Sequence, residues 1–232
     1  MVIRNQILSL SYRVLLLALG VASLTVLVLD ASAASLWRYE SVLTLLSSVL
    51  VLIEIVVNCI SLKDGVRRMA AGVYPAITFL FLSLELGLMV GHPLYTFLSD
   101  IPYFEDGLGF AAIFLPLILF PILYFLDWLL FGEKGTVKPF HLISLSAFPL
   151  LYYLSSLLNH LIKGEDAKYA TLVFDPRTFL NNANLSLVMK ENEGWNGVAV
   201  ACFSLLLIDI GCGLLLLLTS RFLAKNSLSS KL

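Results

Sequence analysis

The chain has 232 residues, of which 59% are hydrophobic and only 13% are charged, and its formal net charge is −1. This composition excludes an ordinary soluble domain, in which about a quarter of the residues are charged. The near-neutral charge and the lack of a basic region interleaved with aromatic residues argue against a nucleic-acid partner. We therefore expect an integral membrane protein whose immediate partners are membrane lipids.

The apolar residues gather into six stretches, each close to the roughly 20 residues that a helix needs to cross a bilayer. In chain order, the predicted spans are 7–29, 41–61, 70–91, 108–131, 139–161 and 196–219. Helices are expected because lipid cannot satisfy open backbone polar groups. The sequence thus predicts an all-α, polytopic integral membrane protein with six transmembrane helices, forming a single membrane domain over residues 1–232.

The positions of lysine and arginine predict the orientation of these spans. Basic residues gather on one side of the predicted membrane: Arg4, Lys63, Arg67, Arg68, Lys134, Lys138, Arg221, Lys225 and Lys231. The short loops on the opposite side carry Arg38 alone. Because cytoplasmic loops are enriched in Lys and Arg, we expect both termini to be cytoplasmic and the 162–195 loop to be external, in a multi-pass protein of the cell membrane.

The first span also allows a second interpretation. Arg4 precedes a long apolar stretch, Arg13 lies near its start, and the small residues of 31–33 follow it. This pattern resembles a secretory signal and its cleavage site. Against this, the apolar stretch is long for a signal, and the charge balance of the next loop fits an uncleaved helix. Cleavage would leave five spans, so the sequence leaves both possibilities open.

Polar residues inside the spans are the candidate functional groups, because an ionised side chain at the bilayer centre costs about 2.5–3.5 kcal/mol on insertion scales. In the second span they recur at helical spacing: Ser41, Thr44, Ser48, Glu54, Asn58 and Ser61. The fifth span shows a similar stripe: His141, Ser144, Tyr152, Ser155, Ser156 and Asn159. Such stripes should face other helices, either to form hydrogen bonds between them or to line a polar cavity. The residues predicted for a ligand-binding cavity are Glu54, Asn58, Glu85, Tyr152, Ser156 and Asn159.

Three further polar residues, Arg13, Asp127 and Asp209, are predicted to have structural roles. Asp127 lies about one turn from the cytoplasmic end of its span, so water or a basic partner such as Arg13 is expected to satisfy it. Asp209 lies near the middle of the last span, beside Gly211 and Gly213, where small residues allow a neighbouring helix to approach. Pairing with Arg13 or protonation would each reduce the energetic cost of Asp209.

Neither a metal centre nor a cofactor site is predicted. Cys59, Cys202 and Cys212 all lie within predicted spans and lack zinc-type spacing, so they are expected to act as small packing residues. The sequence contains no phosphate-binding loop, dinucleotide fingerprint or zinc-protease motif. It also shows no convincing internal repeat of the kind that many transporters have.

A set of motifs in residues 121–176 resembles those of a known family. They are Pro121, Asp127-Trp128-Leu129-Leu130-Phe131, Gly132-Glu133-Lys134-Gly135, Pro149-Leu150-Leu151-Tyr152 and Phe174-Asp175-Pro176. With these motifs the chain resembles the bacterial six-span membrane proteins related to the animal androgen-induced and androgen-dependent membrane protein family. In the C-terminal half the resemblance rests on these motifs, whereas in the N-terminal half it rests only on the predicted order of the spans. It implies a location in the bacterial plasma membrane.

The resemblance also implies where a reaction would occur. Characterised animal members of the family hydrolyse fatty acid esters of hydroxy fatty acids, using a threonine early in the second helix and a histidine in the fourth. Here Ser41 and Thr44 offer the hydroxyl, but residues 108–131 contain no histidine. Because a hydroxyl nucleophile needs a base, His160 at the outer end of the fifth span is the replacement that the sequence offers.

Three hypotheses for function follow. The first is a family member that binds a lipid-like or amphipathic molecule, or serves as an accessory subunit of another membrane protein, without the usual catalytic histidine. The second is an intramembrane lipid-ester hydrolase that uses Ser41, Thr44 and His160. The third is a transporter of a small solute or ion. Its candidate residues are Glu54, Glu85, Asp127 and Asp209.

Overall fold

The computed structural model describes residues 6–31, 39–64, 73–99, 107–151, 154 and 195–229. All of the regular elements in these ranges are helical. They are α1 (Gln6–Ala31), α2 (Tyr39–Asp64), α3 (Val73–Ser99), α4 (Gly107–Phe114), η2 (Leu115–Leu119), α5 (Phe120–Phe131), α6 (His141–Ser144) and α10 (Trp195–Ser229). The prediction of an all-helical protein is therefore confirmed for the described residues.

Several of these helices have the length and composition of membrane spans. Four are long and apolar enough to cross a membrane: Gln6–Leu29, Ser41–Ser61, Gly107–Phe131 and Leu206–Ala224. Two shorter apolar helices cover Pro75–Val90 and His141–Leu151. Large apolar side chains such as Leu15 and Leu215 are 60% and 67% exposed on the outside of the bundle, where they suit contact with lipid. Most of the second half of the predicted fifth span, and nearly all of the 162–195 loop, lie outside the described residues.

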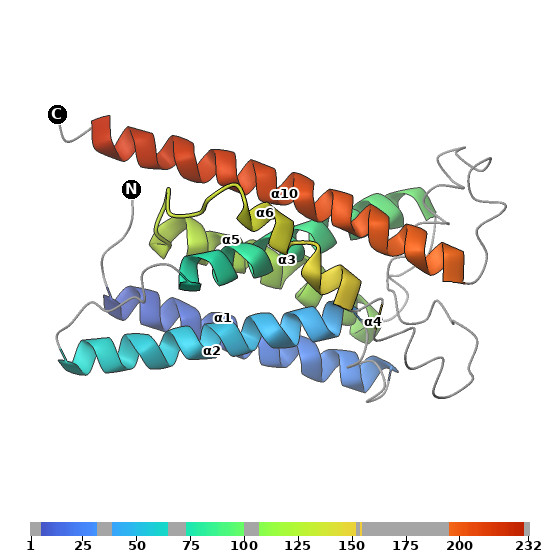
Figure 1. Ribbon diagram of the computed structural model, residues 1–232. Coiled ribbons are helices and arrows are strands. Elements are labelled where there is room, and N and C mark those ends of the chain that lie inside the picture. Colours follow the sequence, from blue (N-terminus) through green and yellow to red (C-terminus); the bar gives the residue numbers. More distant parts are fainter. Residues whose placement is uncertain are drawn as a thin grey trace.

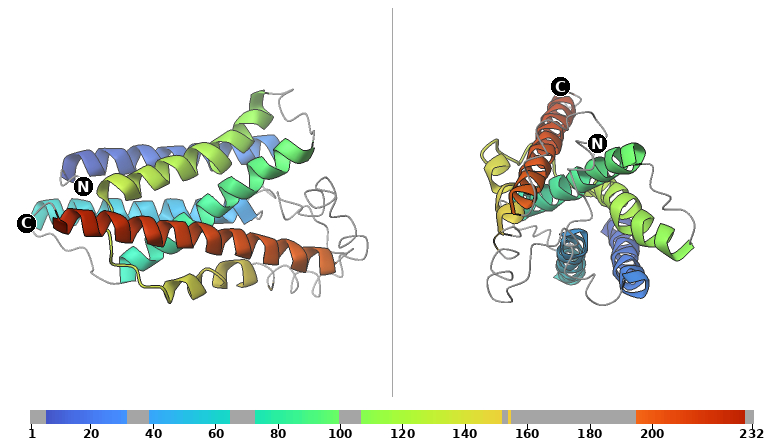
Figure 2. Two further views of the ribbon diagram at one scale, coloured as in Figure 1. Left: turned by 90° about the horizontal axis from the view of Figure 1, so that it is seen from above. Right: turned by 90° about the vertical axis from the view of Figure 1, so that its right-hand side faces the viewer.

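From α1 to α5, successive long helices run in opposite directions along the bundle, and α10 runs in the same direction as α5 (Figure 1). α1 and α2 form a closely packed pair on one side, α10 packs along α3 on the other, and α5 contacts both α1 and α3. Figure 2 shows the same arrangement from above and along the bundle, with α3 crossing between α10 and the remaining helices. The first residue of α1 and the last residue of α10 lie at the same end of the bundle (Figure 1).

The core lies where α1, α3 and α5 meet. Leu16 of α1, Phe79 and Leu82 of α3, and Phe120 and Tyr124 of α5 are all at most 1% exposed and belong to one cluster. In a membrane, lipid tails are as apolar as these side chains, so close packing rather than exclusion of water holds them together. The central position of α3 therefore depends on how well these side chains interlock.

The fourth predicted span contains one wide turn. Pro116 and Pro121 have no backbone N–H, so each removes a hydrogen bond that an α-helix would make. In an α-helix the N–H of Phe120 would donate to the carbonyl of Pro116. Here it donates to the carbonyl of Leu115, five residues earlier, which is the π-helical pattern. The predicted span 108–131 thus corresponds to the apolar helical segment Gly107–Phe131, which contains this π-helical turn at Leu115–Leu119.

Glycines allow α10 to approach its neighbours closely. At Gly87 of α3, an added Cβ would collide with the carboxylate of Asp209 and would stand 3.2 Å from its Cα. At Gly213 of α10, an added Cβ would stand 2.6 Å from Leu145 Cδ1. The predicted close approach is therefore found at Gly213, whereas a Cβ at Gly211 would meet no described atom within 4 Å.

The contrast between two glycines gives a test of this packing. Gly87→Ala should lower the thermal stability by about 1–3 kcal/mol, the usual effect of overpacking, because the backbone of α10 blocks the new methyl group. Gly211→Ala is the matched control and should be neutral or slightly stabilising, because it only improves helix propensity. Thermal unfolding of both variants in detergent measures this difference, and equal shifts would contradict the α3–α10 contact.

Candidate functional site

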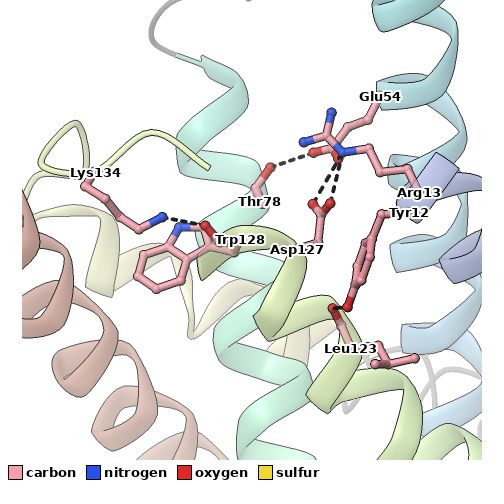
Figure 3. A network of polar contacts seen from close by, with 8 residues as sticks. All are labelled: Tyr12, Arg13, Glu54, Thr78, Leu123, Asp127, Trp128 and Lys134. Carbon is pink, nitrogen blue, oxygen red and sulfur yellow. Dashed lines mark hydrogen bonds and ion pairs between the residues drawn. The ribbon is translucent and has the colours of Figure 1, made fainter. Parts of the chain in front are cut away.

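A buried ion pair joins the helices near one end of the bundle. Arg13 of α1 lies between Glu54 of α2 and Asp127 of α5, and all three side chains are at most 3% exposed. Arg13 Nε is 3.0 Å from Glu54 Oε2 and donates to Asp127 Oδ1 at 3.2 Å. The hydroxyl of Thr78 on α3 donates to Glu54 Oε1 at 3.3 Å. Figure 3 shows these four residues, which we call the ion-pair cluster.

The alternating helix directions bring the ion-pair cluster together. Arg13 and Thr78 lie early in their helices, whereas Glu54 and Asp127 lie late in theirs, so antiparallel neighbours place all four at one level. A guanidinium matches carboxylates well because its donors are fixed in a planar fork. The expected contact between Asp127 and Arg13 is therefore present, and it is buried within the bundle.

The loop after α5 is held by Lys134. Its Nζ donates to the carbonyls of Trp128 and Gly132 and lies 4.0 Å from the centroid of the Trp128 ring. Burial lowers the pKa of Lys134 to about 8, while the negative charge of Asp127 acts in the opposite direction. Lys134 thus satisfies carbonyls at the end of the helix and covers the buried Trp128 (Figure 3).

Gly135 connects this loop to the last helix. Its φ of 79° is a left-handed conformation, which glycine adopts at little cost because it has no Cβ. Its N–H donates to Ser220 Oγ of α10 at 2.8 Å. The Gly-Glu-Lys-Gly segment therefore ends α5 and ties it to α10.

Three substitutions test the ion-pair cluster. Asp127→Asn keeps an oxygen for Arg13 and leaves Glu54 to balance its charge, so thermal stability should change little. Asp127→Leu removes the acceptor and should cost about 1–3 kcal/mol. Arg13→Leu should cost more than either, because it leaves two buried carboxylates without their cation. Thermal unfolding of purified protein in detergent gives the ranking, and an Arg13→Leu variant as stable as Asp127→Asn would contradict it.

Four hydroxyl side chains lie on the buried face of α2. Ser41, Thr44, Ser47 and Ser48 are at most 4% exposed, and their oxygens have no hydrogen-bond partner among the described residues. Glu85 of α3 is completely buried, and both of its carboxylate oxygens are likewise without a described partner. Its carboxylate faces Ser47 across the α2–α3 contact, outside hydrogen-bond geometry. We call these five residues the Glu85 site.

Helix packing explains why these hydroxyl groups are buried. They recur at helical spacing along one side of α2, the side that packs against α1, α3 and η2. Ser48 Oγ occupies the space beside Gly20 of α1, where an added Cβ would collide with it. The prediction that Ser48 and Glu54 point into the bundle is confirmed, because they are only 4% and 2% exposed. Asn58 is half-buried, and its Nδ2 has no described partner.

Tyr124 of α5 is a further buried polar residue. It is completely buried, and its hydroxyl has no hydrogen-bond partner among the described residues. Sequence analysis missed Tyr124, because one tyrosine in an apolar helix is usually a packing residue. Ser47 was also missed, although its spacing of three residues from Thr44 was a usable signal.

Asp209 lies in the contact between α3 and α10. It is 1% exposed, its carboxylate rests against Gly87, and its Oδ2 has no hydrogen-bond partner among the described residues. Pairing with Arg13 and protonation were the two predicted ways to reduce the energetic cost of burying this carboxylate. Pairing with Arg13 does not occur, because Arg13 pairs with Glu54 and Asp127.

The remaining predicted site residues can be placed only in part. Tyr152, Ser156, Asn159 and His160 lie outside the described residues, so the combination of Ser41, Thr44 and His160 stays a prediction. Within the part of the chain that the structure describes, no group of three metal-ligating side chains occurs. No protein-family model, curated protein or solved structure matches this chain.

Proposed function

We propose that this protein binds the polar head of a lipid-like or amphipathic molecule at the Glu85 site, as a non-catalytic relative of the androgen-induced membrane protein family. One observation supports the proposal: four hydroxyl groups on one face of α2, and the carboxylate of Glu85 that faces one of them, Ser47, are buried without described hydrogen-bond partners. Burying such groups unpaired is costly. A ligand head that forms hydrogen bonds with them would offset that cost.

The surroundings of α2 favour an amphipathic ligand. On its outer face, Leu45, Leu46 and Val49 are 46%, 37% and 44% exposed, whereas its inner face carries the hydroxyl groups. A molecule that enters from the bilayer would therefore meet apolar side chains first and hydrogen-bonding groups deeper in. Ligand sites in proteins commonly combine mostly apolar walls with a few polar groups that fix orientation.

The fourth span supports binding over hydrolysis. The family resemblance places its histidine in the turn before Pro121, and that turn contains Leu117, which is only 1% exposed. Leu117 lies in η2, which packs against α1, α2 and α3. Since leucine cannot accept a proton from Ser41 or Thr44, this position offers no general base for an acyl-transfer reaction.

We also propose six spans with both termini in the cytoplasm, in the plasma membrane of a bacterium. The start of α1 and the end of α10 at one end of the bundle support an even number of crossings (Figure 1). The loop with Lys134 and Lys138 lies at this same end, since Gly135 contacts Ser220. The positive-inside rule therefore favours the cytoplasm on that side.

Ligand retention tests the proposed function. Protein purified in mild detergent should retain an amphipathic molecule that mass spectrometry detects. Thr44→Val removes one hydroxyl at similar volume and should reduce retention roughly 2- to 10-fold, as expected for about 0.5–1.5 kcal/mol. Thr219→Val is the matched control, because Thr219 is exposed and its hydroxyl donates to Leu215 of its own helix at 2.8 Å. Absence of any retained molecule, or equal retention by both variants, would contradict the proposal.

Cysteine labelling tests the orientation at the two ends of one span. In a background without Cys59, Cys202 and Cys212, a membrane-impermeant maleimide added outside should label Gly107→Cys and miss Thr136→Cys. Both positions are exposed, so a difference in labelling reports the side of the membrane. The reverse pattern would invert the topology, and labelling of both positions would exclude a crossing between them.

A further inference from the structure

We infer that the Glu85 site selects an amphipathic molecule whose head is a primary ammonium group on an alkyl chain. The inference rests on the proposed function and adds the chemical class of the head. It follows from the charge and hydrogen-bonding capacity of the described residues around Glu85.

The Glu85 site has a surplus of hydrogen-bond acceptors. An ionised carboxylate only accepts hydrogen bonds, and a hydroxyl group accepts more than it donates. Neither oxygen of Glu85 has a partner among the described residues, and the same holds for the oxygens of Thr44 and Ser47. A head with several N–H donors therefore complements this site better than a head that mainly accepts.

No described basic side chain is available to balance Glu85. Arg13 is already matched by two carboxylates, at 3.0 Å from Glu54 and 3.2 Å from Asp127. The other Lys and Arg residues in the described ranges belong to the end of α2, the loop after α5 or the end of α10. They are Lys63, Lys134, Lys138, Arg221 and Lys225. Glu85, near the middle of α3 and seven residues beyond Thr78 of the ion-pair cluster, lies away from that end of the bundle.

A positively charged head would supply the missing charge. A buried carboxylate without a counter-charge is costly, so an unliganded carboxyl group in such a site tends to hold a proton. A cation within a hydrogen-bonded site takes the place of that proton and pairs with the ionised form. An ammonium group brings both the charge and the donors. A carboxylate head would be repelled by Glu85, and an alcohol head would form a hydrogen bond without balancing the charge.

Equilibrium binding to the full chain in phosphatidylcholine nanodiscs tests this selection. The probes are radiolabelled dodecylamine, dodecanol and dodecanoate at pH 7, which share one chain length, and empty nanodiscs provide the blank. Wild-type protein should bind dodecylamine about 10-fold or more tightly than the other two, equivalent to about 1.4 kcal/mol. Glu85→Gln should weaken dodecylamine binding by a similar factor and remove the preference.

Two further variants control for indirect effects. Glu85→Asp keeps the charge and should keep the preference for the amine. Asp209→Asn removes a buried carboxylate on the α10 side of α3 and should leave amine binding unchanged. If Glu85→Gln does not fold, the ranking of the three probes on the wild type decides the question.

The following outcomes would overturn the inference. Equal binding of dodecanol and dodecylamine, or an unchanged affinity of Glu85→Gln for the amine, would show that Glu85 does not select charge, while the proposed binding function would stand. Binding of none of the probes would reject an ammonium amphiphile. The proposed function would then be decided separately by the molecule retained during purification.

Discussion

The guanidinium of Arg13 lies between the carboxylates of Glu54 and Asp127, and the relative positions of α1, α2, α3 and α5 depend on this interaction. Apolar contacts alone specify little in a membrane, because lipid competes equally for apolar surfaces. A buried ion pair is different, since a shift of one helix by a turn would leave charges unpaired in a medium that cannot solvate them. The ion-pair cluster therefore fixes the register of these four helices.

The Glu85 site follows from this register. Once Arg13 is bound by two carboxylates, Glu85 has no basic partner among the described side chains, although it is completely buried. Among the described residues, the charges of the ion-pair cluster are thus paired within the protein, whereas the carboxylate of Glu85 is not. Buried polar groups without hydrogen-bond partners are expected at functional sites. This difference supports the Glu85 site, rather than the ion-pair cluster, as the proposed ligand site.

The Asp-Trp-Leu-Leu-Phe and Gly-Glu-Lys-Gly motifs act together in the structure. Asp127 holds α1, Trp128 is covered by Lys134, and Gly135 donates to Ser220 of α10. These contacts connect the end of α5 to the first and last helices of the chain. The motifs that carry the family resemblance therefore have a structural explanation that requires no catalytic role.

The sequence by itself determined the all-helical membrane class, because apolar stretches of span length allow no other fold in lipid. It also determined the buried face of α2 through the helical spacing of its polar residues, and it named Arg13 as a partner for Asp127. Only the tertiary structure decided that Arg13 also binds Glu54, and that the close contact of α10 with α3 forms at Gly87 rather than Gly211. The reason is that such contacts depend on the rotation and spacing of neighbouring helices, which packing across the whole bundle sets and no local pattern encodes.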